Sequence, residues 1–420
     1  MIFNREEQHL MLEGSVLSKE DVKRLVACYT EEASGFLYEL YRFLEEWYIK
    51  EEMTLEETNN CEIIDELIRQ GRSFAMYRNP GEEEPHFLMQ TCGEVHLIRK
   101  MEDLNGRTGF VIAPFRVTPQ CPIILIRPDC HEIPSCAGNL HTPAQGDDAA
   151  SYGQQLRSDW SLGAKKAYEA CFDVFIRALR ERTFDKLVLS RRMTVRREPG
   201  FSPAAAFYRA CRRYIYSYVY LCYTPQTGVW MGSTPEIILS GEKGEWNTVA
   251  LAGTQSLQNG ELPQQWDEKN REEQEYVAAY IRKQLRSLGI SPTEKGPYPA
   301  FAGALSHLKT DFHFSLNDSQ RLGDLLKLLH PTPAVCGLPK EEAYRFILDN
   351  EGYDRSYYSG FIGWLRPEGR TDLYVNLRCM NVKEDSLTLY AGGGLLASSE
   401  LDDEFQETEK KMQTMQNLNS

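Results

Sequence analysis

Long apolar segments are absent from the 420-residue chain, and none approaches the roughly 18 residues that a membrane span requires. The first residues include Arg5, Glu6 and Glu7 in place of the apolar core of a secretory signal. The eleven cysteines include no CxxC pair, which favours reduced thiols over a disulfide framework. We therefore expect a cytoplasmic protein without disulfides and without a membrane partner.

Basic clusters are also absent. The chain has 61 acidic and 47 basic side chains, which gives a formal net charge of −14, and no run is rich in lysine or arginine. Nucleic-acid binding normally needs a basic face, so nucleic acid is not expected as a partner. A small anion can still bind an acidic protein if a metal ion or a few arginines supply local positive charge. No obligatory protein partner is implied.

Motifs for nucleotides and redox cofactors are missing as well, since neither GxxxxGK[ST] nor GxGxxG occurs. What is present is a set of glutamates on two segments with helical periodicity: Glu273 in NREEQEYVAAYI, and Glu404 with Glu407 in LDDEFQETEKKM. Carboxylates without a His or Cys cluster suit Mg²⁺, which takes few protein ligands and keeps water or substrate bound. We therefore expect Mg²⁺ as the cofactor and an anionic small molecule as the substrate.

The composition also indicates how the chain is organised. Its length allows between one and about three domains. Residues 134–158 are polar and rich in small side chains, which predicts an exposed connection. No linker-like segment interrupts residues 160–415. We expect residues 1–150 to be a variable N-terminal part of the same unit, which gives one large domain overall.

Hydrophobic periodicity predicts both helices and strands. Helical spacing occurs at residues 19–50, 54–71, 163–182 and 271–288, near residue 340 and from about residue 401. Strand-like runs are SFAMYRN, HFLMQ, EVHLIRK, GFVIAPF, DKLVLSRRMTV, YSYVYLCY, VWMGSTPEIILS, WNTVALAGT, GFIGWL, LYVNLRCMNV and SLTLYAGGG. Because many strands follow one another without a helix between them, the pattern favours an α+β fold with mainly antiparallel sheets.

Two side chains are candidates for acid–base chemistry. Lys186 in DKLVLSRR is flanked by apolar strand residues, so it is either at a sheet end that reaches water or desolvated, as a lysine acting as general base must be. Glu236 follows a proline at the start of an apolar run in GSTPEIIL. It is either a solvated turn residue or an acid whose pKa is raised by apolar surroundings, which could protonate a leaving group.

The glutamates near the C-terminus have a structural alternative. Glu404 and Glu407 are three residues apart and share a helix face, and Ser399 with Asp402 forms the pattern of a capping box that starts this helix. Acidic residues are also common in early helical turns, Glu273 included, because they complement the helix dipole. A purely structural role therefore stays open for all three glutamates.

Two further features are suited to anions. Gly392, Gly393 and Gly394 end the strand-like run SLTLYA, where glycine allows either a tight turn or a close approach of backbone N–H groups to an anion. Arg378 lies inside the run LYVNLRCMNV, where burying it is costly unless it is paired. Its guanidinium could clamp a carboxylate with two hydrogen bonds.

The order of the motifs along the chain carries a family resemblance. They are DKLVLSR, GSTPEIIL, ALAGT, EEQEYV, HPTPAVCG, YSGFIGW, NLRC, YAGGG and EFQET. In this order they resemble the chorismate-utilising enzymes: isochorismate and salicylate synthases, and the large subunits of anthranilate and aminodeoxychorismate synthases. The resemblance covers about residues 160–415. It implies a large sandwich of antiparallel sheets flanked by helices, with these residues as the chorismate-binding catalytic region.

The resemblance also implies roles for single residues. Lys186 matches the lysine that activates water, and Glu236 matches the acid that protonates the departing hydroxyl. Glu273 and Glu407 match the principal Mg²⁺ ligands, and Glu404 matches a supporting one. The positions that match the lining of the chorismate site are Gly253, Thr254, His330, Arg378, Tyr390 and Gly393.

The resemblance is strongest to isochorismate synthase, an isomerase whose product feeds menaquinone or siderophore synthesis. Aminating relatives tend to have KGT where this chain has Ala252-Gly253-Thr254, and the anthranilate branch lacks the lysine found at Lys186. Both features imply water as the nucleophile. Salicylate synthase, which adds pyruvate elimination, and a catalytically silent chorismate-binding regulator remain alternatives. Gln255 replaces the arginine that usually follows AGT, which removes a cation near the site.

Overall fold

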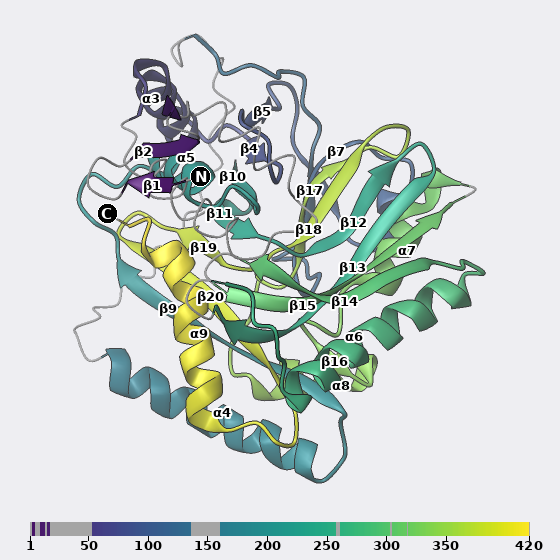
Figure 1. Ribbon diagram of the computed structural model, residues 1–420. Helices are drawn as coiled ribbons and strands as arrows, with labels where there is room; N and C mark the ends of the chain where they lie inside the picture. The colour runs from purple at the N-terminus through teal and green to yellow at the C-terminus, as the bar shows by residue number, and fades with distance from the viewer. Residues whose placement is uncertain are drawn as a thin grey trace.

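Two large antiparallel sheets form the centre of the protein in a computed structural model (Figure 1). The structure describes residues 2–4, 9–12, 15–16, 53–135, 160–257, 261–302, 305–316 and 318–419. Near the N-terminus, β1 (Ile2–Asn4), β2 (His9–Leu12) and β3 (Ser15–Val16) form a small antiparallel sheet of their own. The helix predicted at residues 19–50 lies outside the described residues.

The two large sheets draw strands from both halves of the chain. The eight-stranded sheet has the order β16 (Gly337–Leu338), β9 (Lys186–Arg196), β20 (Ser386–Leu395), β19 (Cys379–Val382), β11 (Gly228–Thr234), β10 (Tyr218–Thr224), β4 (Phe74–Arg78), β5 (His86–Met89). The nine-stranded sheet has the order β14 (Thr293–Ala302), β15 (Leu305–Ser315), β13 (Glu245–Ser256), β12 (Ile237–Glu242), β18 (Thr371–Val375), β17 (Phe361–Leu365), β7 (Gly109–Ala113), β8 (Ile123–Ile126), β6 (His96–Ile98). All pairings between these described strands are antiparallel.

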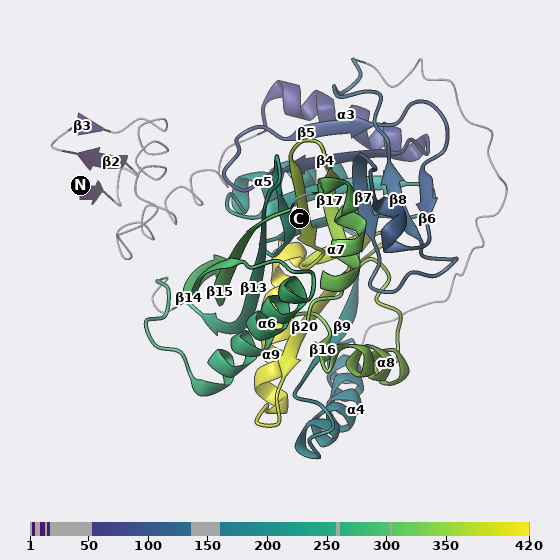
Figure 2. The same ribbon diagram turned by 90° about the vertical axis from the view of Figure 1, so that its right-hand side faces the viewer.

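Helices cover the outer faces of the two sheets (Figures 1 and 2). The eight-stranded sheet packs against α3 (Leu55–Arg69), α5 (Pro203–Arg213) and α9 (Leu401–Gln416). The nine-stranded sheet packs against α6 (Glu268–Ser287) and α7 (Leu322–Leu329). Near β9, α4 (Trp160–Arg180) and α8 (Lys340–Asn350) enclose a further apolar cluster.

Side-chain alternation along the strands explains this layering. In β10, Val219 and Leu221 face the helical layer, whereas Tyr218 and Tyr220 face the other sheet. Tyr218 stacks on Tyr374 of β18 with ring centroids 4.3 Å apart, so aromatic residues fill the space between the sheets. The predicted α+β sandwich with mainly antiparallel sheets is therefore confirmed.

Two predicted strands are wrong as continuous elements. The run VWMGSTPEIILS divides at Pro235 and Glu236 into β11 of one sheet and β12 of the other. The run LYVNLRCMNV divides in the same way between β18 and β19. Arg378 is therefore not inside a strand, and its backbone has a φ of 43° in the left-handed region. Apolar periodicity cannot distinguish a strand from two shorter strands that pass from sheet to sheet.

The glycines Gly392–Gly394 do not end their strand. β20 continues through them to Leu395, paired with β9 throughout. Close packing requires glycine at Gly394, since a Cβ atom added there would lie 2.0 Å from Glu273 Oε1 and 2.9 Å from Lys186 Cε. The tight-turn alternative is therefore wrong.

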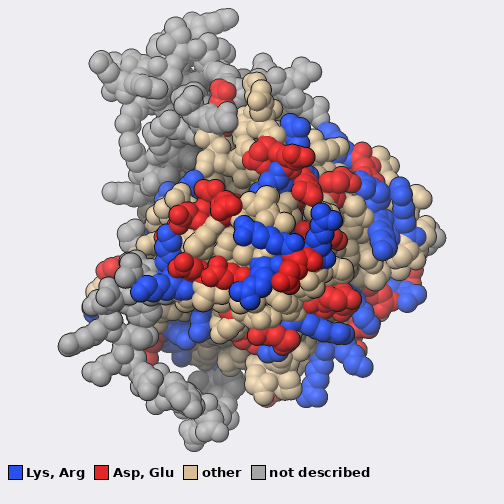
Figure 3. Space-filling view, turned by 90° about the horizontal axis from the view of Figure 1, so that it is seen from below, with Lys and Arg blue, Asp and Glu red and all other residues tan. Residues whose placement is uncertain are grey.

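Charged side chains of both signs are interspersed on the face seen from below Figure 1, without a continuous basic area on that face (Figure 3). The described helices contain no segment with both the length and the apolar character of a membrane span. The cysteines in the described ranges are free thiols.

Candidate active site

The candidate site lies where the chain passes twice between the two sheets. At the first crossing, Glu236 lies between β11 and β12, and its carbonyl accepts a hydrogen bond from Val375 N–H at 2.8 Å. At the second crossing, Arg378 lies between β18 and β19, and its carbonyl accepts one from Ser233 N–H at 3.1 Å. These bonds hold the two crossings side by side, so the chain's path between the sheets brings an acid and an arginine together.

A small pocket opens at these crossings. Its lining includes five residues that the sequence assigned to the site: Glu236, Gly253, Thr254, Glu273 and Arg378. A second, outer pocket shares Thr254 with the first pocket. The outer pocket contains the other two predicted metal ligands, Glu404 and Glu407.

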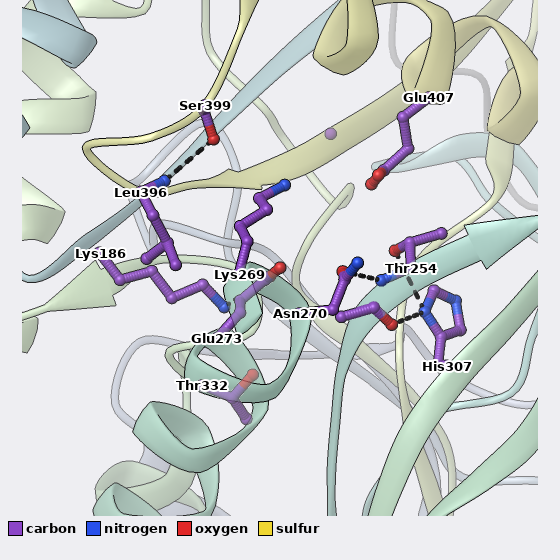
Figure 4. A network of polar contacts seen from close by, with 12 residues as sticks. Lys186, Thr254, Lys269, Asn270, Glu273, His307, Thr332, Leu396, Ser399 and Glu407 are labelled. Atoms are coloured by element: carbon purple, nitrogen blue, oxygen red, sulfur yellow. Dashed lines mark hydrogen bonds and ion pairs between the residues drawn. The ribbon is translucent and has the colours of Figure 1, made fainter. Parts of the chain in front are cut away.

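Lys186 begins β9 and is fully buried, so the water-reaching alternative is wrong. Its Nζ lies 3.1 Å from Oε1 of Glu273 on α6, and Figure 4 shows the two side chains pointing toward each other. The approach is an ion pair without hydrogen-bond geometry, and Nζ donates to no other group in the described part of the chain. The side chain of Lys186 lies behind the pocket wall at Gly394, so its Nζ, which has no hydrogen-bond partner among the described residues, is close to the pocket.

Glu236 is buried, with 3% of its surface exposed, so it is not a solvated turn residue. Thr332 Oγ1 donates a hydrogen bond to its Oε1 at 3.3 Å. Burial raises the pKa of Glu236 to about 7, although Arg378 and Lys186 both oppose the shift. A carboxyl group with this pKa keeps its proton near neutral pH, as a general acid must.

Arg378 is buried, and one nitrogen of its guanidinium has no hydrogen-bond acceptor among the described residues. Its Nη2 donates to His307 Nε2 at 2.6 Å, whereas its Nη1 has no hydrogen-bond partner among the described residues. His307 also bonds the Gly253 carbonyl through Nδ1 at 2.9 Å. Since a buried guanidinium requires partners, Nη1 marks a position for an anionic ligand in this pocket.

The AGT segment is tied to the start of α6. Gly253 has a φ of 73°, and a Cβ atom there would lie 2.7 Å from the Asn270 carbonyl oxygen, so only glycine fits. Thr254 N–H donates to Asn270 Oδ1 at 2.7 Å (Figure 4). Gln255 lines the outer pocket and donates to Asp267 at 3.1 Å, so this replacement of an arginine lies outside the inner pocket.

Each predicted metal carboxylate has a lysine partner. Glu404 Oε1 accepts hydrogen bonds from Lys269 at 2.6 Å and Ser399 Oγ at 2.7 Å. Glu407 Oε1 accepts one from Lys411 at 2.7 Å. Burial raises the pKa of Glu404 to about 7, although Lys269 opposes the shift. Burial also raises the pKa of Glu407, but the charges of Lys411 and Lys269 outweigh burial. The pKa of Glu407 therefore lies below its usual value.

The capping box expected from Ser399 and Asp402 is wrong. The N-cap of α9 is Glu400, which makes no side-chain capping bond. The Ser399 hydroxyl donates to Glu404 instead, while its oxygen accepts the Leu396 N–H at 3.1 Å. Ser399 therefore orients a site carboxylate rather than the helix start.

The carboxylates fit a cation with few protein ligands. Throughout the described ranges, no three His, Cys, Asp or Glu side chains form a metal centre by themselves. Mg²⁺ needs only one or two carboxylates beside water and substrate. A Cβ atom added to Gly393 would lie 3.2 Å from Glu404 Oε2 and 3.3 Å from Glu407 Oε1, so both oxygens converge over this glycine. Glu404 Oε2 is also buried without a hydrogen-bond partner in the described ranges. These oxygens therefore suit Mg²⁺.

Four of the predicted site residues are not among the residues that line either pocket: Lys186, His330, Tyr390 and Gly393. His330 Nε2 bonds the Pro114 carbonyl at 3.1 Å, and burial lowers the pKa of His330 to about 3. His330 lies two residues before Thr332, whose hydroxyl donates a hydrogen bond to Glu236. Tyr390 stacks between Trp230 and Tyr358. Tyr390 therefore packs against Tyr358, which lines the inner pocket.

Sequence reasoning missed four residues of the site: His307, Tyr358, Lys269 and Lys411. Lys411 carried a signal, because it lies one helical turn after Glu407 and such pairs meet on a helix surface. His307 carried none, since LSHLKTD contains no motif and only the strand pairing places it at Gly253.

Comparison with known proteins identifies the family of this chain. Residues 131–418 match the family model described as chorismate binding enzyme. Isochorismate synthase EntC of Escherichia coli is 29% identical over 242 residues, which cover 56% of this chain and 62% of that protein. DhbC of Bacillus subtilis is 34% identical over 197 residues, which cover 44% and 49%. The salicylate biosynthesis isochorismate synthase of Pseudomonas aeruginosa is 30% identical over 268 residues, which cover 62% and 56%. The chain therefore matches about half to three fifths of the length of these relatives.

Solved structures show the same fold. A putative 2,3-dihydroxybenzoate-specific isochorismate synthase of Bacillus anthracis aligns with a TM-score of 0.65 at 22% identity, over 85% of this chain and 99% of that chain. MenF, the menaquinone-specific isochorismate synthase of E. coli, aligns with a TM-score of 0.66 at 20% identity, over 85% and 91%. Because the family model covers more than half of the sequence, the protein belongs to the chorismate binding enzyme family.

Proposed function

We propose that the protein is an isochorismate synthase, which isomerises chorismate to isochorismate with Mg²⁺. In this reaction water adds at C2 of the ring and the hydroxyl at C4 leaves as water. The observation that carries the proposal is a buried acid with a pKa of about 7, Glu236, in the pocket lining, together with the buried Lys186 behind the lining residue Gly394. The relatives named isochorismate synthase support the same reaction.

Lys186 and Glu236 each take part in one of the two proton transfers. Lys186 is the residue that would accept a proton from the attacking water, because its buried Nζ has no hydrogen-bond partner among the described residues. Glu236 donates its proton to the departing C4 oxygen, and its pKa of about 7 suits this donation. Substrate and product are isomers, so positioning and proton transfer supply the catalysis.

Binding of the two substrate carboxylates rests on different residues. Arg378 Nη1 and the β20 backbone at Gly392–Gly394 hold the enolpyruvyl carboxylate, because Nη1 finds no acceptor in the described protein. Glu273 and Glu407 would bind Mg²⁺, with Glu404 in support. When bound, the ion would supply the positive charge that holds the ring carboxylate against the acidic protein.

Salicylate synthase is the second candidate, since it shares the acid, the base and the metal ligands. One relative is named for salicylate biosynthesis, but the same name describes it as an isochorismate synthase. A silent chorismate-binding regulator is less favoured because it would not require Lys186 and Glu236 beside the pocket. The strands β4 to β8 from the N-terminal part belong to the two large sheets, which supports a single unit that includes this part. We also propose that the enzyme is cytoplasmic.

Product analysis tests the proposal. Purified protein with chorismate and Mg²⁺ should give an equilibrium mixture containing isochorismate, while a lactate dehydrogenase assay should detect little pyruvate. Lys186→Ala and Glu236→Gln should each reduce kcat by roughly 10²- to 10⁴-fold while chorismate still binds. Pyruvate formed at the rate at which chorismate disappears would establish salicylate synthase instead. Unchanged turnover in both variants would refute the assigned roles.

A further inference from the structure

A buried ion pair lies behind the pocket and has no part in the chemistry described above. Glu351 follows α8, Arg355 follows four residues later, and each side chain is about 1% exposed. Arg355 Nε and Nη2 donate to the two carboxylate oxygens of Glu351, each at 2.6 Å. The guanidinium also lies 4.4 Å over the Phe115 ring. This fork geometry makes a rigid, charge-assisted unit.

The remaining donors of Arg355 reach the walls of the pocket. Nη1 donates to the Val335 carbonyl at 2.7 Å, and Nη2 donates to the Val188 carbonyl at 2.9 Å. Val188 and Val335 both line the pocket. Val188 lies two residues after Lys186 on β9. One guanidinium therefore ties the lysine's strand to the segment that runs from Thr332 to Leu338.

Glu351 fixes the same strand at a second point. Its Oε1 accepts hydrogen bonds from Ser190 N–H at 2.7 Å and from Ser190 Oγ at 2.8 Å. Ser190 pairs with Gly392 in the β9–β20 ladder, and Gly392 also lines the pocket. The ion pair thus contacts β9 at the Val188 carbonyl and at the Ser190 amide, on the residues just beyond Lys186.

We propose that Glu351 and Arg355 are positioning residues that hold Lys186 at a fixed distance from Glu236. The connection to Glu236 runs through the segment that Arg355 grips, because Thr332 on that segment donates to the Glu236 carboxyl group. The effect on turnover rests on the proposed function, whereas the effect on geometry does not.

The alternative is that the pair serves stability alone. Replacing both members of a buried ion pair by apolar residues is often neutral for stability, whereas removing one member leaves an unpaired charge. The double variant Glu351→Leu with Arg355→Met therefore separates the two roles. The matched control is Arg282→Met with Glu294→Gln, which removes an ion pair between α6 and β14 away from the pocket.

Two readouts decide the question: steady-state kinetics with chorismate, and hydrogen exchange of peptides that contain Val188 and Cys336. We expect kcat of the double variant to fall about tenfold to a hundredfold with KM within about threefold, since small displacements of reacting groups are costly. Exchange should accelerate in both peptides, because the Val188 N–H donates to the Cys336 carbonyl at 2.8 Å. The control should change neither.

Wild-type kcat and wild-type exchange in the double variant would overturn the proposal. If the wild-type protein does not convert chorismate, the proposed function fails, and the exchange of the two peptides alone decides the positioning role. If the double variant does not fold, Arg355→Lys takes its place. This variant keeps the buried charge but cannot reach both carbonyls, so we expect the same fall in kcat and the same faster exchange. Wild-type kcat and exchange in this variant would also overturn the proposal.

Discussion

His307 holds Arg378 in place by accepting a hydrogen bond from its Nη2 at 2.6 Å. The imidazole can accept this bond because it is neutral, since burial first, and then the charges of Arg378 and Lys411, hold the pKa of His307 well below its usual value. Its Nδ1 then carries the proton and donates to the Gly253 carbonyl. This tautomer leaves Nε2 as the acceptor and Nη1 of Arg378 free for substrate.

His307→Phe should therefore weaken chorismate binding. The phenyl ring keeps the shape but cannot accept from Arg378, so we expect KM to rise about tenfold, as for loss of a hydrogen bond to a charged group. Steady-state kinetics measures the change. His313→Phe is the control, because His313 lies on the same strand but is exposed. Equal KM values for wild type and His307→Phe would contradict the orienting role.

The raised pKa of Glu236 predicts a pH-dependent stability. The folded state keeps this proton up to about pH 7, whereas the unfolded chain loses it near 4.5, so the wild type loses stability as pH rises between these values. Glu236→Gln lacks this titration. We therefore compare the free energy of unfolding of Glu236→Gln with that of the wild type at each pH. The variant minus wild-type difference should be more positive above pH 7 than at pH 4, by up to about 3 kcal/mol. Denaturant titrations at pH 4 and pH 8 measure this.

The pKa of Glu236 also predicts how activity changes at alkaline pH. Because only the protonated acid can donate to the C4 oxygen, kcat/KM should fall as pH rises through about 7. A kcat/KM that stays level from pH 6 to pH 9 would contradict Glu236 as the acid, as would a stability difference between wild type and Glu236→Gln that is the same at both pH values.

Removal of the metal should abolish activity. We expect no turnover in excess EDTA and full recovery with excess Mg²⁺. Glu273→Gln and Glu407→Gln should each weaken Mg²⁺ binding at least tenfold in titration calorimetry, because each removes one of the few charged ligands. Glu275→Gln is the control, since this glutamate is 62% exposed on the same helix as Glu273. Full activity in EDTA would remove the metal from the account.

Ammonia should not replace water as the nucleophile. Ala252 lies in the pocket lining where aminating relatives tend to have lysine. Reactions in ammonium salts should therefore yield neither anthranilate nor aminodeoxychorismate by chromatography. An aminated compound as the main product would show that the nucleophile was wrongly assigned.

Much of this architecture follows from periodicity, but the site does not. The helices at residues 54–71, 163–182 and 271–288 were predicted because each repeats one apolar pattern. The crossings at Glu236 and Arg378 were hidden, because the apolar residues on either side belong to different sheets. A one-dimensional pattern does not contain that change of sheet.

The partners of the candidate residues were equally hidden. The sequence pointed to Glu404, but its contact with Lys269 depends on how α9 and α6 approach each other. Arg378 was expected to need a partner, yet His307 meets it only through strand pairing in the nine-stranded sheet. Long-range contacts of this kind set the protonation states on which the mechanism depends.

The most direct test of the account is the isomerisation of chorismate in water enriched in oxygen-18. Lys186 is proposed to activate a solvent water that becomes the C2 hydroxyl, while the C4 oxygen leaves with the proton from Glu236. Mass spectrometry of the isochorismate formed should therefore show one heavy oxygen per molecule. Isochorismate without the label would mean that the hydroxyl moves within the substrate, and it would contradict the central claim.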